Sequence, residues 1–342
     1  MVYLRRMLGS LLILLSLPAS AEFVTVITFG GAVKDAQQTA FFKPFKDSSN
    51  NAVVHGSYNG DLEKLKDMIN MSHVTWDVVE VEAPELARGC AEDLFEKLEP
   101  GLAGPASDFV PGAIQPCGVG IFVWSTVLAY DQAKLKTAPN GWRDFWDTAK
   151  IPGKRGMRWG AKYNLEFALM ADGVAPKDVY DVLETQAGVD RAFRKLSELK
   201  NSIIWWKAGA EPVRNLQDGS VIMSVAYNGR IAAAQAENKT FSLVWTGGIY
   251  DFDYWAIPKG SWKGKLGREF IAFASQPAQQ KLFAESIAYS PINNRAIAMI
   301  DPARAKQLPT APQNIADAIP MNVAFWAKNG EALEKRFEGW VK

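Results

Sequence analysis

The feature that most constrains the fold is a regular alternation of short apolar runs with helical segments along nearly the whole chain. The apolar runs have the length and composition of buried strands, and they cover residues 24–29, 76–81, 119–124, 203–206, 221–226 and 254–258. Segments with helical periodicity or capping residues separate them, among them 30–45, 61–69, 84–94, 177–184, 189–200, 229–237, 267–274 and 277–286. Strands separated by helices predict parallel α/β sheets.

The first 21 residues have the pattern of a cleavable export signal. Two arginines at 5–6 precede an apolar stretch at 8–17, and the small residues 19–21 (Ala-Ser-Ala) form a cleavage site. An apolar stretch of about ten residues is too short to span a bilayer. We therefore expect a mature chain that begins at Glu22 and is soluble in the periplasm.

The remaining length predicts two lobes. The full chain has 342 residues, and even without the signal it exceeds what one compact core usually holds. No linker or low-complexity tract separates two halves, so the chain is expected to cross between the lobes more than once. Removal of the two signal arginines changes the formal charge from +1 to −1, a balance that does not favour nucleic acid or anionic membranes as partners.

Cys90 and Cys117 are the two cysteines of the chain. In an oxidising compartment an isolated pair predicts a disulfide, and the spacing excludes a CxxC redox motif.

The sequence has few features of an enzyme. Two histidines, His55 and His73, are too few for a histidine-rich metal site, and both are expected at the surface. Neither a phosphate-binding loop nor a nucleophile elbow occurs. One SxxK match, from Ser197 to Lys200, leaves an exported hydrolase as an alternative, but it falls on the polar side of an amphipathic helix. We expect no catalysis, no cofactor and no metal.

Two charged residues suggest a binding site. Arg230 follows the strand at 221–226 and begins a helix, at the strand end where open α/β sheets bind ligands. A guanidinium there can bind a carboxylate through two hydrogen bonds. Asp253 lies between aromatic residues, where a carboxylate needs a partner such as a ligand ammonium. From the residues alone, a solvated Arg230 and an Asp253 that caps a turn fit equally well.

The order of motifs along the chain resembles the polyamine-type family of periplasmic ABC-transporter binding proteins. The resemblance covers nearly the whole mature chain and is carried by TFGGAVKDAQQTAFFKPF, WDVVEVEAPELARGCAEDLFEKLEP, CGVGIFVWSTVLAYD, GMRWGAKYNLEFALMADG, AYNGRIAAAQAE, YDFDYWAIPKG and YSPINNRA. It implies a type II periplasmic-binding-protein fold, with two α/β lobes that close on a ligand about a hinge. We expect the chain to cross between lobes near 124–128 and 250–253. The lobes would comprise 22–126 with 252–296, and 127–251 with 297–342.

The chain departs from polyamine binders at the ligand. The family commonly has an acid where Arg230 stands and a second acid at Asp253, and it tends to place aromatic and acidic residues where Gly30 and Gly31 stand. A cation facing the ligand repels a linear diamine by about 4 kcal/mol at 4 Å and an effective dielectric of about 20. Arginine opposite aspartate suits a zwitterion instead, as in the family branch that binds γ-aminobutyrate (GABA). A putrescine or spermidine binder remains the alternative.

The predicted function is capture of a small zwitterionic amine for an inner-membrane ABC permease and ATPase, by a protein that acts as a monomer. A sensor or scaffold role is a further alternative. Arg230 would bind the carboxylate and Asp253 the ammonium, and the pair would also hold the two lobes together. The supporting ligand contacts that we expect are Phe29, Gly30, Gly31, Glu82, Trp124, Tyr227, Tyr250 and Tyr289.

Overall fold

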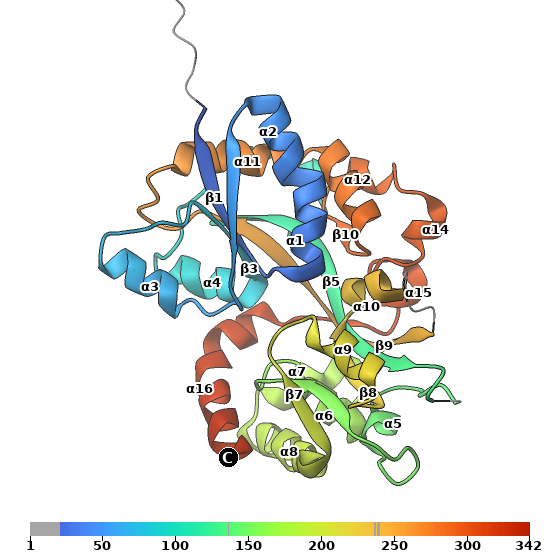
Figure 1. The fold of residues 1–342 in the computed structure, drawn as a ribbon. Coiled ribbons are helices and arrows are strands. Elements are labelled where there is room, and N and C mark those ends of the chain that lie inside the picture. The colour runs from blue at the N-terminus through green and yellow to red at the C-terminus, as the bar shows by residue number, and fades with distance from the viewer. Residues whose placement is uncertain (1–20, 136, 236, 238–239) are drawn as a thin grey trace, which may run out of the picture.

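The structure is a computed structural model that describes residues 21–135, 137–235, 237 and 240–342 (Figure 1). The predicted signal peptide, except its last residue, lies outside the described residues. Two α/β lobes stand one above the other in Figure 1, and ribbons of β5 and β9 run between them.

One sheet runs through both lobes in the strand order β2-β1-β3-β9-β5-β8-β6-β7. Strands β1 to β3 belong to the first lobe, and β6 to β8 belong to the second. The strands of this path are β1 (Phe23–Thr28), β2 (Ala52–Ser57), β3 (Val78–Glu82), β5 (Gly118–Asp131), β6 (Arg155–Arg158), β7 (Ile203–Trp206), β8 (Met223–Tyr227) and β9 (Phe241–Ala256). Short strands β4 (Ile114–Gln115), β10 (Ser290–Pro291) and β11 (Ile319–Pro320) pair beside it.

The two central strands, β5 and β9, connect the lobes. They have 14 and 16 residues, and at about 3.3 Å per residue each is long enough to serve both lobes. Their antiparallel pairing extends from Gly118 opposite Ala256 to Asp131 opposite Phe241. In the first lobe β3 pairs with the end of β9, and in the second β8 pairs with the end of β5.

The sequence predicted only part of each central strand, residues 119–124 of β5 and, with the segment 254–258, the last three residues of β9. It also predicted parallel sheets, whereas the sheet is mixed. The pairs β1–β2, β1–β3, β6–β7 and β6–β8 are parallel, as expected. Pairs that include β5 or β9 on this path are antiparallel. The reason is the double crossing, because the chain leaves the first lobe along β5 and returns along β9 in the opposite direction.

Helices cover both faces of the sheet. Those of the first lobe are α1 (Gly31–Gln37), a π-helical turn (Gln38–Phe42), α2 (Lys43–Ser49), α3 (Glu63–Asn70), α4 (Ala83–Ala91), α11 (Gly264–Ala274) and α12 (Pro277–Ser286). Those of the second are α5 (Trp142–Trp146), α6 (Asn164–Ala171), α7 (Val179–Leu183), α8 (Gln186–Ser197), α9 (Glu211–Asp218) and α10 (Asn228–Gln235). None of the described helices is long and apolar enough to cross a membrane.

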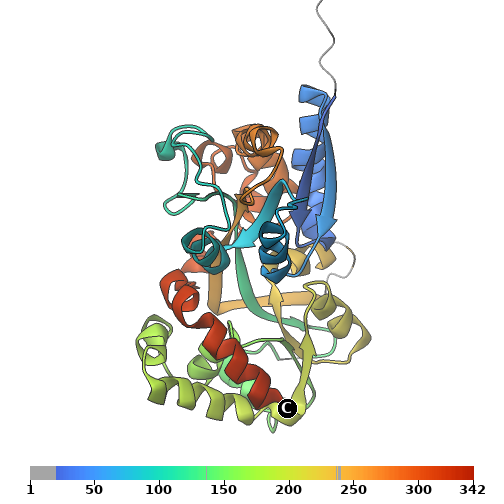
Figure 2. The ribbon, with the colours of Figure 1, turned by 90° about the vertical axis from the view of Figure 1, so that its left-hand side faces the viewer.

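The last segment of the chain contacts both lobes. After α13 (Asn294–Ile297), α14 (Pro302–Ala305) and α15 (Pro312–Ile315), helix α16 (Val323–Val341) runs down the second lobe (Figure 2). Ile300 and Leu308 instead form an apolar cluster with Ala284 and Ala288 of the first lobe. The division into 22–126 with 252–296 and 127–251 with 297–342 therefore stays a proposal.

The two predicted surface histidines are exposed, and His55 lies on the edge strand β2, which the sequence analysis did not identify. Cys90 of α4 and Cys117, just before β5, form the predicted disulfide, with Cα atoms 5.8 Å apart. The bond ties a helix of the first lobe to the start of a crossing strand.

Replacing both Cys90 and Cys117 with serine should lower the free energy of unfolding by about 3–4 kcal/mol, because the bond closes a loop of 27 residues in the unfolded chain. Urea denaturation of the oxidised protein and the double variant measures this difference. Wild-type protein held reduced is the control and should lose the same amount. A double variant as stable as the oxidised protein would contradict the prediction.

Candidate ligand-binding site

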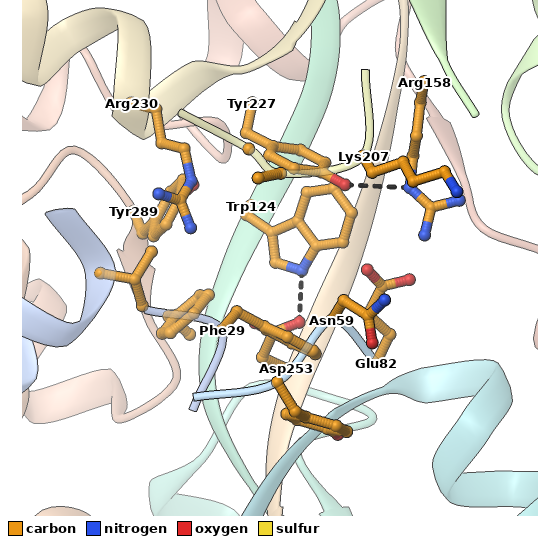
Figure 3. Close-up of a pocket in the computed structure, with 15 residues that line it drawn as sticks. Phe29, Asn59, Glu82, Trp124, Arg158, Lys207, Tyr227, Arg230, Asp253 and Tyr289 are labelled. Atoms are coloured by element: carbon orange, nitrogen blue, oxygen red, sulfur yellow. Dashed lines mark hydrogen bonds between the residues drawn. The ribbon is translucent and has the colours of Figure 1, made fainter. Parts of the chain in front are cut away.

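A cavity of about 100 Å³ lies between the lobes, beside the crossing strands (Figure 3). Its lining comes from three sources. The first lobe contributes Phe29, Val33, Tyr58, Asn59, Glu82 and Tyr289; the second contributes Arg158, Lys207, Ala208, Gly209, Tyr227 and Arg230; the crossing strands contribute Phe122, Trp124 and Asp253. The predicted residues Phe29, Glu82, Trp124, Tyr227, Arg230, Asp253 and Tyr289 are thus brought together from segments far apart in sequence.

The crossing strands form the floor of the cavity. Trp124 of β5 donates a hydrogen bond from Nε1 to Asp253 Oδ1 of β9 at 2.7 Å. Both side chains are almost fully buried. Trp124 also packs edge-on against Tyr227, with ring centroids 5.0 Å apart. The indole therefore positions the carboxylate and lies between it and Tyr227 (Figure 3).

Tyr250 does not join this group. Side chains alternate between the two faces of a strand, so Tyr250 and Asp253, three residues apart, point in opposite directions. Tyr250 packs instead in the apolar cluster of Phe109 and Val123. The structure therefore places Tyr250 away from the cavity, contrary to the expected ligand contact.

Arg230 lies in the first turn of α10, directly after β8. Asn228 anchors this turn, because its side chain accepts a hydrogen bond from Ser125 N of β5 at 2.9 Å and donates one to Ala288 O at 2.7 Å. Arg230 is buried, and its Nη2 donates to Gly30 O across the cleft at 3.2 Å. Its Nε has no hydrogen-bond partner among the described residues. The guanidinium thus bridges the lobes and keeps donor capacity beside the cavity.

Gly30 and Gly31 contact this guanidinium rather than line the cavity. Gly31 has φ +58°, and a Cβ atom there would lie 2.4 Å from Arg230 Nη1. Glycine is therefore required both by the left-handed backbone and by the close approach of the arginine. Phe29, the residue before them, does line the cavity and stacks on Tyr58 with ring centroids 5.3 Å apart.

Glu82 lines the cavity, but its charge is already paired. Its Oε2 accepts hydrogen bonds from Lys162 Nζ at 2.6 Å and from Tyr163 OH at 2.8 Å. Lys162, from the loop between β6 and α6, also binds Glu85 Oε1 at 2.7 Å. Burial alone raises the pKa of Glu82, but the attraction of Lys162 and Arg158 brings this pKa below its usual value. The ion pairs join the two lobes on the far side of the cavity from Arg230.

The sequence analysis missed Arg158 and Lys207, which add two cationic side chains to the lining. Arg158 ends β6 and donates from Nε to Tyr227 OH at 3.2 Å. The rule that singled out Arg230, a charged residue at the carboxyl end of a parallel strand, applies equally to Arg158 in the motif GMRWGAKYN. Lys207 lies over the Trp159 ring, 4.9 Å from its centroid. It directly follows β7, predicted at 203–206, so the same rule would have marked it.

This arrangement suits the capture of a small polar molecule. A buried cation and a buried carboxylate face one enclosed space, and aromatic rings separate them. In the part of the chain that the structure describes, no cluster of three or more metal-ligating side chains occurs. The fold and the cavity thus define the class, a two-lobed protein that encloses its ligand at the hinge.

Comparison with known families agrees with this class. Residues 40–310 match the family of bacterial extracellular solute-binding proteins. The chain belongs to this family, whose members bind small-molecule ligands.

Individual relatives cover almost the whole chain. A Pseudomonas aeruginosa protein named gamma-aminobutyric acid-binding protein is 52% identical over 323 residues, which are 94% of this chain and 92% of the relative. An ABC transporter substrate-binding protein from Bradyrhizobium japonicum USDA 110 is 35% identical, with a TM-score of 0.85 over 94% of this chain and 100% of that one. The GABA receptor Atu4243 is 30% identical, with a TM-score of 0.83 over 94% and 98%.

Replacing Lys162 with methionine should lower the free energy of unfolding by about 3 kcal/mol near neutral pH, because Glu82 and Glu85 are left without their buried cation. Lys150→Met is the matched control, since Lys150 pairs with Asp144 at the surface and should cost less than about 1 kcal/mol. Urea denaturation measures both variants.

The difference between wild type and Lys162→Met should shrink as the pH falls. The lowered pKa of Glu82 means that the ion pair stabilises the folded protein above the usual glutamate pKa and is lost as the pH drops through the folded value. Equal losses for Lys162→Met and Lys150→Met at every pH would contradict this assignment.

Proposed function

We propose that this chain is the periplasmic substrate-binding protein of an ABC importer and that it captures a small zwitterionic amine, with GABA as the first candidate. The observation that carries the proposal is the placement of Arg230 and Asp253 at one cavity, which the packed rings of Trp124 and Tyr227 also line. The ligand carboxylate pairs with Arg230, and its ammonium pairs with Asp253 and contacts the aromatic faces.

Closure of the lobes completes the site. Arg230 comes from the second lobe and meets the backbone of Gly30 in the first, so a carboxylate on the guanidinium touches both sides of the cleft. Asp253 lies on the crossing strand itself, where the hinge moves least. A ligand with both charged groups therefore favours the closed form over the open one. The protein performs no chemical step on its ligand.

Two further parts of the proposal rest on the family and on the sequence. Export by the signal at residues 1–21 brings the protein to the periplasm, and the closed, loaded monomer delivers its ligand to an inner-membrane permease driven by an ATPase. The names of the relatives support the ligand, because the P. aeruginosa protein and Atu4243 are both named for GABA.

The runner-up, a polyamine binder, fits the cavity less well. Acidic residues Glu82 and Asp253 line it, but so do Arg158, Lys207 and Arg230. Lys162 already neutralises Glu82. A linear diamine would place its second ammonium near one of the three cations, and like charges about 4 Å apart repel by about 4 kcal/mol at an effective dielectric of about 20.

Calorimetry tests the ligand. Mature protein, unfolded and refolded to remove bound ligand, is titrated with GABA, putrescine, spermidine and common α-amino acids. We expect saturable binding of GABA and much weaker binding of the diamine. Tight putrescine binding without any response to amino acids would replace the zwitterion proposal with the polyamine alternative.

Arg230→Gln should weaken GABA binding by about 1.5–3 kcal/mol, roughly ten- to 150-fold, because a hydrogen-bonded charged contact is lost. The same change should weaken putrescine binding less or strengthen it, since a repelling cation is removed. Arg191→Gln is the control, because Arg191 pairs with Asp172 at the surface of the second lobe. Unchanged GABA affinity in Arg230→Gln would remove this residue from the site.

Gly31→Ala should lower GABA affinity about tenfold or more, because the new methyl group displaces the Arg230 guanidinium. Gly101→Ala is a matched control with the same left-handed backbone (φ +83°) and no atom within 4 Å of the added Cβ. Both variants should lose about 1 kcal/mol of unfolding free energy through backbone strain. Equal affinities in the two variants would show that the close approach of Gly31 to Arg230 does not matter.

A further inference from the structure

A second carboxyl group lies directly behind Asp253. Glu80 of β3 points to the same side of the sheet, two residue pairs along from the Glu82–Asp253 pair in the antiparallel register with β9. Its side chain is fully buried, and it does not line the cavity. Glu80 Oε2 accepts a hydrogen bond from Phe29 N at 3.0 Å, so this carboxyl group also anchors the loop that carries Gly30 and Gly31.

The register sets Glu80 and Asp253 diagonally across from each other on one face of neighbouring strands, and both side chains are buried. After burial, the negative charge of Glu80 is a further cause that raises the pKa of Asp253. Asp253 Oδ1 accepts the indole N–H of Trp124, whereas Glu80 Oε1 is buried without a hydrogen-bond partner among the described residues. Gln37, a neutral amide beside Glu80, lowers the pKa of this carboxyl group but supplies no charge. Two buried carboxylates on such neighbouring positions repel each other, so ionising both is costly and we expect the pair to hold one proton.

The other ionisable groups around Glu80 and Asp253 do not make a proton on this pair unnecessary. On β3, Glu82 is committed to Lys162, and Asp251 on β9 adds another buried acid, whose pKa burial and Glu82 raise. Tyr58 and Tyr289 face the pair as neutral phenols, because burial raises the pKa of each. Arg230 of α10 is the cation that attracts Glu80, and it acts from across the cleft. Burial is the main cause that raises the pKa of both Glu80 and Asp253.

We propose that Glu80 is a positioning residue that shares a proton with Asp253 and that this proton leaves when the ligand ammonium binds. The inference rests on the proposed function and deepens it. One proton passes from the carboxyl pair to solvent, the ammonium takes its place beside Asp253, and no covalent bond in the ligand changes. Capture of the amine end is thus an exchange of one cation for another in a buried site.

The exchange gives a selection rule for the ligand. An ammonium group can displace the shared proton, whereas a hydroxyl group of the same size can only hydrogen-bond to the protonated pair. GABA should therefore release a proton on binding, and 4-hydroxybutyrate should not. The affinity for GABA should rise with pH while the pair is protonated, by up to about tenfold per pH unit, and then level off.

Calorimetry at one pH in two buffers of different ionisation enthalpy counts the protons released. GABA stays a zwitterion between about pH 5 and 9, so its own ionisation does not contribute in this range. We expect wild-type protein to release up to about one proton per GABA near pH 6, and Glu80→Gln to release close to none, with a flat affinity profile from about pH 5 to 8. In this variant the amide N–H donates to Asp253, which stays ionised. Glu269→Gln, an exposed acid of α11 paired with Lys265, should behave as wild type.

The outcomes separate this inference from the proposed function. GABA binding with no buffer-dependent heat and no pH dependence in wild-type protein would overturn the proton exchange and leave the GABA proposal intact. This test uses wild-type protein alone, so it does not depend on whether Glu80→Gln folds. Proton release that persists unchanged in Glu80→Gln would place the proton on another group. Failure of wild-type protein to bind GABA at all would overturn the proposed function instead.

Discussion

The structure depends on the antiparallel pairing of β5 with β9, which continues from one lobe into the other. This ladder is the middle of a single sheet, so the first and second lobes share backbone hydrogen bonds rather than only side-chain contacts. The floor of the cavity belongs to these strands, and Asp253 and Trp124 therefore stay in place when the lobes move. Residues that reach the cavity from the lobes, such as Arg230, can approach or leave this floor by rotation about the strands.

Burial of charge at this junction is balanced locally. Glu82 and Glu85 are neutralised by Lys162, so these three residues link the lobes without offering a free charge to the ligand. Among the described residues, Arg230 hydrogen-bonds only to a backbone carbonyl, and the side chain of Asp253 accepts a hydrogen bond from the Trp124 indole. Neither Arg230 nor Asp253 forms an ion pair among the described residues, and a zwitterion would supply a counter-ion to both.

Much of this site was accessible from the sequence because its chemistry sits at the ends of strands. Arg230 after β8 and Glu82 at the end of β3 follow from that rule, and Lys207 after β7 would have followed as well. Arg158 ends β6, a strand that the sequence did not predict. The sequence could have excluded Tyr250 as a ligand contact. It lies an odd number of residues from Asp253 on one strand, so the two side chains point to opposite faces of the sheet. Glu80 was beyond reach, because nothing in the strand WDVVEV indicates that its side chain lies diagonally across from a carboxyl group of β9.

The sequence by itself implies α/β units, two lobes and a disulfide, because periodicity acts on short segments, chain length limits the size of one core, and the export signal sets the redox compartment. The pairing of a cation with an acid at the ligand came from the family resemblance, since the residues alone left it open. Only the tertiary structure decided which charged side chains are paired within the protein and which are left for a ligand. The partners that make the difference are far apart in sequence, 80 residues between Glu82 and Lys162 and 200 between Arg230 and Gly30. Burial and the pairing of side chains arise only when both lobes close around the crossing strands, and no local pattern records them.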